Sequence, residues 1–185
     1  MMAAITTGGT APEAEPDLVA APEPRREYGV VVEAGLDIDE FFPEALAYHE
    51  LIQDLRTNGY WMCLDVCVVD YLYHRERHVA VGIVPERFEV VVHLMNFERA
   101  QRVRVRVQVS EKDPKIDSIM DIHPGAETPE REAFDMFGIE FVNHPDLTRI
   151  LMPPEWVGHP LRKDYNIGRV PVQFKGDPLG SGGAR

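Results

Sequence analysis

Long apolar runs, abundant cysteine and a positive net charge are all missing from this 185-residue sequence. No run approaches the roughly eighteen apolar residues of a transmembrane helix, and the N-terminus lacks the basic start and apolar core of a secretory signal. We therefore expect a chain that is soluble and cytoplasmic on its own. Its two cysteines cannot supply the four thiolates of an ordinary iron–sulfur cluster.

Motifs that bind nucleotides or activate water are also missing. The sequence contains no GxGxxG, GxxxxGK[ST], HExxH or GxSxG pattern. His74 and His78 have a spacing that could chelate a metal on a helix, but their charged neighbours favour a solvated turn. Cys63 and Cys67 lie in one predicted strand, about 13 Å apart, which is too far for a disulfide, so we interpret both as core thiols.

The charge balance excludes non-specific binding to nucleic acid. With 19 Lys and Arg against 31 Asp and Glu, the net charge of −12 would repel phosphate. The balance reverses in residues 149–185, which hold six basic residues and three acidic ones. This segment is therefore suited to an acidic protein surface.

Three regions are predicted from composition. Residues 1–27 are rich in proline and poor in bulky apolar side chains, so we expect a disordered leader. Residues 28–142 contain the periodic segments of an α+β domain. Residues 143–185 are interrupted by prolines, which predicts an extended arm that binds across another subunit.

The periodic segments predict a mixed, largely antiparallel sheet of four to five strands with helices packed on it. Valines alternate with arginines and a glutamine over residues 102–109, which indicates a strand with one core face and one basic face. A hairpin would place this basic face beside Glu89 or His93. The strands are expected at residues 28–33, 60–70, 88–97 and 102–109, with a less certain one at 78–84.

Two helices and one helical turn are predicted around these strands. Residues 43–59 repeat apolar side chains at helical spacing, and Asn58-Gly59 is a stop signal. Residues 116–125 suggest a helical turn. The segment 128–138 indicates a helix with Thr128 as N-cap, Pro129 in its first turn and Gly138 at its end.

Several polar residues near this last helix allow more than one role. Prolines hold His123, His144 and His159 in extended backbone, where a structural role is commoner than proton transfer. Arg131 and Asp135 would pair at i,i+4 spacing. A distant alternative is a free-standing metal-dependent hydrolase that uses the three histidines with Glu130 or Asp135.

The stretch from residue 130 to residue 165 resembles the C subunit of respiratory complex I, the 30 kDa subunit family of the proton-translocating NADH:quinone oxidoreductase. It carries an EREAFDMFG block, an HPDLTRIL block and a GHPLRKD block in the order of that family. Thr148 and Asn143 stand where the family commonly has arginine and glycine. The matching residues, which the resemblance places at a subunit interface, include Glu130, Arg131, Glu132, Asp135, Phe137, Gly138, His144, Pro145, Asp146, Arg149, His159, Pro160, Arg162, Lys163 and Asp164.

The resemblance implies a structural subunit without redox groups or catalytic residues of its own. Flavin, iron–sulfur clusters and quinone would lie in partner subunits, and this chain would pack against the D subunit, which forms the quinone site, and against adjacent iron–sulfur subunits. The complex would hold it on the cytoplasmic face of the inner membrane as a peripheral protein. The alternative within this resemblance is the equivalent subunit of a membrane-bound hydrogenase or another quinone-linked dehydrogenase.

Overall fold

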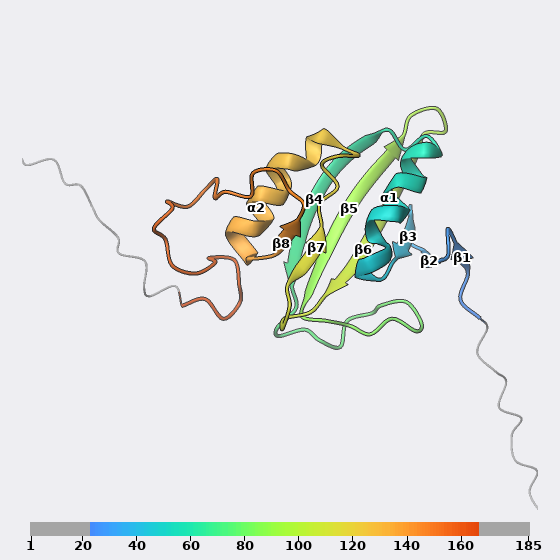
Figure 1. Ribbon diagram of the computed structural model, residues 1–185. Coiled ribbons are helices and arrows are strands. Elements are labelled where there is room, and N and C mark those ends of the chain that lie inside the picture. Colours follow the sequence, from blue (N-terminus) through green and yellow to red (C-terminus); the bar gives the residue numbers. More distant parts are fainter. Residues whose placement is uncertain (1–22, 167–185) are drawn as a thin grey trace, which may run out of the picture.

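A computed structural model describes residues 23–166, in which strands form one large sheet and one small sheet (Figure 1). The strands are β1 (Arg26–Glu27), β2 (Val30–Ala34), β3 (Asp39–Phe42), β4 (Met62–Asp70), β5 (Phe88–Asn96), β6 (Gln101–Val109), β7 (Lys115–Asp117) and β8 (Glu140–Val142). The helical segments are the 3-10 turns η1 (Ala45–Ala47) and η2 (Pro124–Ala126) and the helices α1 (Tyr48–Thr57) and α2 (Glu127–Phe137).

The large sheet has six strands in the order β1-β2-β3-β6-β5-β4. Every neighbouring pair is antiparallel except β3 and β6, which are parallel. The predicted fold class, α+β with a mixed and largely antiparallel sheet, is therefore confirmed, although the sheet has more strands than expected. The small sheet pairs β7 with β8 in parallel.

The alternating valines of β6 form the centre of the core. Val103, Val105 and Val107 are buried and face β5 side chains of the same character. α1 covers this face of the sheet with Tyr48 and Leu55, which are among its four buried residues. The helix is shorter than predicted because η1 occupies its expected first turn, and it stops before Gly59, whose φ is +94°.

The opposite face of the large sheet, called the open face below, carries the arginines of β6. Arg106 Nε donates to Glu89 Oε1 at 2.9 Å, and Arg104 Nε lies 2.9 Å from His93 Nε2. This confirms the predicted cross-strand placement. Glu40 of β3 accepts from both arginines, at 2.6 and 2.8 Å, so the charges form a connected ladder.

Three of the predicted elements are wrong in detail. Residues 78–84 form no strand; they belong to a loop whose Ala80 packs on Val31 and Phe42 over the open face. Residues 116–125 begin in β7, where Ile116 pairs with Phe141, and the predicted helical turn comes only after it, at residues 119–123 and in η2. α2 begins at Glu127 with Ala126 as its N-cap, so the predicted Thr128 cap does not form.

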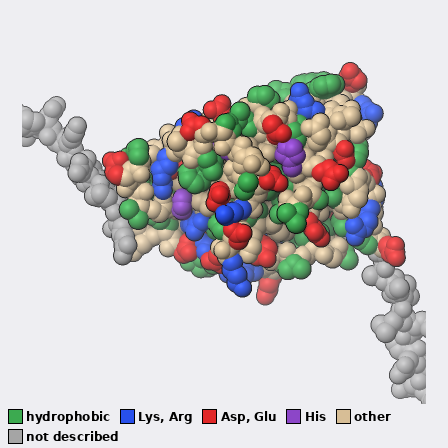
Figure 2. Space-filling view, viewed as in Figure 1, with side chains coloured by type: hydrophobic (Ala, Val, Ile, Leu, Met, Phe, Trp, Pro, Cys, Tyr) green, Lys and Arg blue, Asp and Glu red, His purple; other side chains and the backbone are tan. Residues whose placement is uncertain are grey.

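α2 packs against β4 at one edge of the large sheet, and residues 143–166 continue beyond it without helix or strand (Figure 1). These residues are called the C-terminal arm below. Residues 1–22 of the predicted leader and 167–185 of the predicted arm lie outside the described residues. None of the helices described is long and apolar enough to cross a membrane. Charged side chains of both signs cover the face in Figure 2, with hydrophobic side chains between them.

Candidate interface at helix α2 and the C-terminal arm

The carboxylate of Asp135 joins α2 to the C-terminal arm. Its Oδ2 accepts the backbone N–H groups of Ile150, Leu151 and Met152 at 3.1, 2.7 and 2.8 Å. Its Oδ1 accepts from Arg149 Nη1 at 2.8 Å. Burial alone would raise the pKa of Asp135, but these donors outweigh it and hold the pKa below its usual value. One fully buried side chain thus fixes the backbone of three consecutive arm residues.

Glu130 joins the same helix to the segment that follows β7. Its carboxylate accepts from Ser118 Oγ at 2.5 Å and from the Ile119 N–H at 2.9 Å. His144 Nε2 lies 4.0 Å from it, with both side chains fully buried. Burial raises the pKa of Glu130 above its usual value, against the effect of these donors. The side chain therefore holds the domain together from inside rather than facing a partner.

Gly138 ends α2 in the left-handed conformation, as the sequence predicts, with φ of +72°. A Cβ at this position would lie 2.5 Å from His159 Nε2 and 2.7 Å from Arg162 Nη2. Arg162 Nε donates to the Phe137 carbonyl at 2.5 Å, and the Leu161 N–H donates to the Met136 carbonyl at 3.0 Å. The arm thus binds the free carbonyls at the helix end.

Arg87 anchors the far end of the arm to the large sheet. Its buried guanidinium donates to Asp70 at 2.8 and 3.0 Å, to Asp164 at 2.7 and 3.0 Å, and to Glu111 at 2.6 Å. These carboxylates raise the pKa of Arg87, with Asp70 contributing most. Asp70 Oδ2 also accepts the Lys163 N–H at 2.9 Å. Of this cluster the sequence interpretation named only Asp164 and Lys163 as site residues.

The other signature residues take separate positions. Arg131 donates to the carbonyl and hydroxyl of Thr148 and lies 3.9 Å from Glu127, so its predicted pairing with Asp135 is wrong. Thr148, one of the departures from the family pattern, is thus used within the chain. Residues that are exposed or half-buried at the surface are Glu132, Pro145, Asp146, Pro160 and Lys163.

The three histidines of the hydrolase alternative face different partners. His123 Nδ1 lies 3.3 Å from Arg56 Nη1, and His159 Nδ1 lies 3.0 Å from the Asp135 carbonyl. His144 Nε2 lies 3.3 Å from the Glu127 carbonyl. Among residues 23–166 no group of three or more His, Cys, Asp and Glu side chains is arranged to hold a metal ion.

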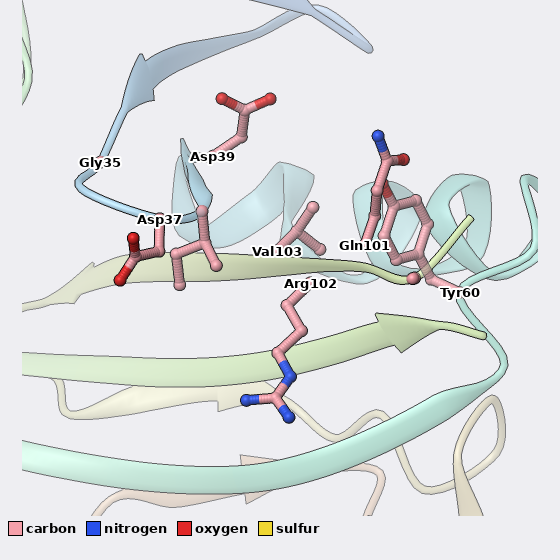
Figure 3. Close-up of a pocket in the computed structure, with 9 residues that line it drawn as sticks. Gly35, Asp37, Asp39, Tyr60, Gln101, Arg102 and Val103 are labelled. Atoms are coloured by element: carbon pink, nitrogen blue, oxygen red, sulfur yellow. The ribbon is translucent and has the colours of Figure 1, made fainter. Parts of the chain in front are cut away.

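A shallow hollow of about 280 Å³ lies at one end of the strands, where the β2–β3 loop approaches the start of β6 (Figure 3). Its lining mixes the carboxylates of Asp37 and Asp39 with Arg102 and Tyr60. None of the signature residues lies in it. The contacts between α2 and the C-terminal arm therefore remain the structural feature that the sequence signature marks.

Comparison with known proteins agrees with this signature. The family described as "Respiratory-chain NADH dehydrogenase, 30 Kd subunit" matches residues 43–170. The C subunit of the NADH-quinone oxidoreductase of Saccharopolyspora erythraea is 38% identical over 160 residues, which cover 82% of this chain and 61% of that protein. The C/D subunit of the NADH-quinone oxidoreductase of Acidiphilium cryptum is 44% identical over 128 residues, or 69% of this chain and 21% of that protein.

A solved structure of a trypsin-resistant fragment of Nqo5 has the same fold. It superposes with a TM-score of 0.57 at 31% identity, and the match covers 64% of this chain and 90% of the fragment. The chain spans about three fifths of the length of the curated relatives it matches, between 57% and 61% for those from Saccharopolyspora erythraea, Salinispora arenicola and Roseiflexus castenholzii.

Proposed function

Since the chain belongs to the 30 kDa subunit family of the respiratory-chain NADH dehydrogenases, we propose that it is a non-redox structural subunit of the NADH:quinone oxidoreductase. It packs against the D subunit, which forms the quinone site, and against adjacent iron–sulfur subunits of the hydrophilic arm. Flavin, iron–sulfur clusters and quinone belong to those partners, so this chain supports electron transfer without carrying a catalytic residue. It lies at the cytoplasmic face of the inner membrane as a peripheral protein.

The proposal is carried by the exposed apolar side chains of the C-terminal arm, which buried hydrogen bonds and ion pairs fix in place. Asp135 and Arg87 fix the C-terminal arm at two points, although the arm has no helix or strand of its own. The arm nevertheless exposes a row of large apolar side chains, which is typical of a surface covered by a partner. They are Ile150, Leu151, Val157 and Leu161, with exposed fractions of 39%, 59%, 87% and 48%.

The C/D relative of Acidiphilium cryptum supports the D subunit as the partner. Two proteins that act together are often joined in one chain when they lie side by side in an assembly. Glu130 and Asp135, which are buried, and Arg149, which is half-buried, act within this chain, where they shape the arm. The partner then contacts the apolar side chains that the C-terminal arm exposes.

The test is purification of the tagged chain from gently solubilised membranes, with mass spectrometry and an NADH:quinone assay. We expect the D subunit and the iron–sulfur, flavin and membrane subunits to be recovered in a fixed ratio, with activity. Recovery of these partners without a flavin subunit would instead assign the chain to a related hydrogenase or dehydrogenase. Recovery of the chain alone would contradict the proposal.

The variant Arg162→Ala examines the arm within the same experiment. Because Arg162 binds the Phe137 carbonyl, its loss should loosen the arm and lower the recovered complex about tenfold, which corresponds to about 1.4 kcal/mol. Lys112→Ala removes the same charge from an exposed residue outside the signature and should leave recovery unchanged. Normal recovery with slower turnover in Arg162→Ala would argue against a structural role.

A further inference from the structure

A groove of about 320 Å³ runs between β4 and α2. Four consecutive residues of β4 form one wall, from Asp65 to Val68. Successive residues of a strand point to opposite faces of a sheet, so a cavity that touches all four lies along the edge of the strand. The groove therefore opens onto the edge of the large sheet rather than onto either face.

On this side β4 pairs with no strand of the described residues 23–166. β4 is the last strand of the sheet, and β5 is its one strand partner within residues 23–166. A bulge at Leu64 interrupts the regular ladder at one end. At the other end the C-terminal arm contacts the strand, because the Lys163 N–H donates to the carboxylate of Asp70. Between these limits lies a short, regular edge that can accept another strand.

The second wall of the groove comes from one stripe of α2. Pro129, Ala133 and Phe137 recur at intervals of four residues and line it, and Leu161 of the arm contributes at its end. These apolar side chains lie beside the core-facing Val66 and Val68. A strand edge next to an apolar helix is a common arrangement for binding an extended peptide, whose backbone pairs with the strand while alternate side chains enter the groove.

Two carboxylates also line the groove, Asp65 on the strand and Glu132 on the helix. Both are exposed, and neither forms an ion pair within residues 23–166. Among the residues that the structure describes, no Lys or Arg lines the groove to balance them. The occupant should therefore bring at least one basic side chain, because opposite charges across an interface set its register and partner.

We propose that this groove receives an extended segment of a neighbouring subunit, which adds to β4 as a seventh strand. The segment is apolar at alternate positions, which contact Ala133 and Phe137, and it carries a Lys or Arg that pairs with Asp65 or Glu132. The inference rests on the proposed function, since the neighbour belongs to the same assembly. A second copy of this chain fits poorly, because pairing two β4 edges would bring the same unpaired carboxylates together.

Amide hydrogen exchange measures the added strand directly. We compare the full-length chain alone with the same chain in the purified complex, using peptides from Met62–Asp70 and from Gln101–Val109. Alternate amides of an edge strand face outward, so about half of the β4 amides should exchange at least about tenfold more slowly in the complex. β6 lies inside the sheet, between β3 and β5, and serves as the internal control. Equal β4 exchange in both samples would overturn the proposal.

A photo-cross-linking residue, p-benzoylphenylalanine, in place of Glu132 identifies the occupant in the intact complex. We expect a cross-linked peptide from another protein of the complex that contains Lys or Arg. The matched control places the same residue at Glu76, an exposed acidic position in the loop after β4 that does not line the groove, and should give no such peptide. A cross-link from position 132 to residues 167–185 of this chain, or to a second copy, would overturn the proposal.

Charge reversal tests the basic side chain of the occupant. Glu132→Arg keeps helix propensity and removes no hydrogen bond or ion pair within the described residues, so the isolated chain should unfold like the native one. Recovery of the complex should fall about tenfold, whereas Glu76→Arg should leave it unchanged. If the chain recovers its partner subunits but Glu132→Arg has no effect, the groove proposal fails while the proposed function stands. If the native chain itself recovers no partner subunit, it is the proposed function that is contradicted.

Discussion

The junction between α2 and the C-terminal arm and the open face of the sheet both depend on charged side chains, but they use them differently. At the junction, Asp135 is fully buried and accepts four hydrogen bonds, one from Arg149 and three from backbone N–H groups of the arm. On the open face, Arg104 is 37% exposed and shares Glu40 with Arg106. The buried carboxylate of Asp135 therefore fixes the backbone of the arm in one conformation. On the open face, by contrast, the loss of one arginine leaves Glu40 with its other partner.

The largest expected effect is at Asp135. Asp135→Ala leaves the Arg149 guanidinium and three backbone N–H groups without their acceptor, which should lower the free energy of unfolding by about 3–5 kcal/mol. Urea unfolding measures the change, and limited proteolysis should cut near residues 150–152. Asp135→Asn keeps one acceptor oxygen and should lose less. A loss below about 1 kcal/mol in the alanine variant would remove the contrast between the two regions.

His123 should make stability depend on pH. It is 2% exposed, and burial together with the nearby Arg56 lowers its pKa from 6.5 to about 4. As the pH falls, His123 binds a proton in the unfolded chain before it does so in the folded chain. Its contribution to the free energy of unfolding is therefore complete above pH 6.5 and is lost as the pH falls toward 4. The loss should approach about 3 kcal/mol.

Urea unfolding between pH 7.5 and 4.5 measures this dependence. Other groups titrate in the same range, so the informative quantity is the difference from His123→Asn. Asn keeps an acceptor for Arg56 but cannot be protonated in this range, and its curve should be flatter. Parallel curves for the two proteins would show that His123 is not held in its neutral form.

Gly138→Ala separates backbone strain from the contacts of the arm. Any side chain at φ of +72° is strained, by about 1–2 kcal/mol, and here a Cβ would also displace His159 and Arg162. Gly29 provides the control because its φ is +76° and a Cβ there meets nothing within 4 Å. We expect a loss of about 1 kcal/mol in Gly29→Ala and about 3 kcal/mol in Gly138→Ala. Equal losses of unfolding free energy in the two variants would mean that His159 and Arg162 are not packed closely against the end of α2.

The sheet and α1 could be predicted from sequence because their signals are local. The alternation of valine with arginine defines both faces of β6, and apolar spacing defines the buried side of α1. The short strand β3 was missed because its sequence, DEFF, has no clear alternation. The loop at residues 78–84 is apolar enough to suggest a strand, but Ala80 packs on residues almost forty and fifty positions away in the sequence.

The junction could be predicted only through its sequence signature. The spacing of Asp135 and Arg149 does not indicate that they pair, and the nearer Arg131 was the expected partner. The Arg87 cluster is even harder to predict from sequence, since Asp70 and Asp164 are 17 and 77 residues away from Arg87. Contacts of this range depend on the whole fold, and no local pattern encodes them.

The smallest expected effect is on the open face. Arg104→Gln removes one member of the ladder, but Glu40 keeps its bond to Arg106, and water can solvate the exposed position. The free energy of unfolding should fall by less than about 1 kcal/mol in urea. Arg149→Gln is the matched change at the junction, where Asp135 would keep its backbone donors but lose its buried ion pair. A larger loss at Arg104 than at Arg149 would reverse the comparison, because it would mean that the shared ladder, and not the buried carboxylate, carries the greater electrostatic contribution to stability.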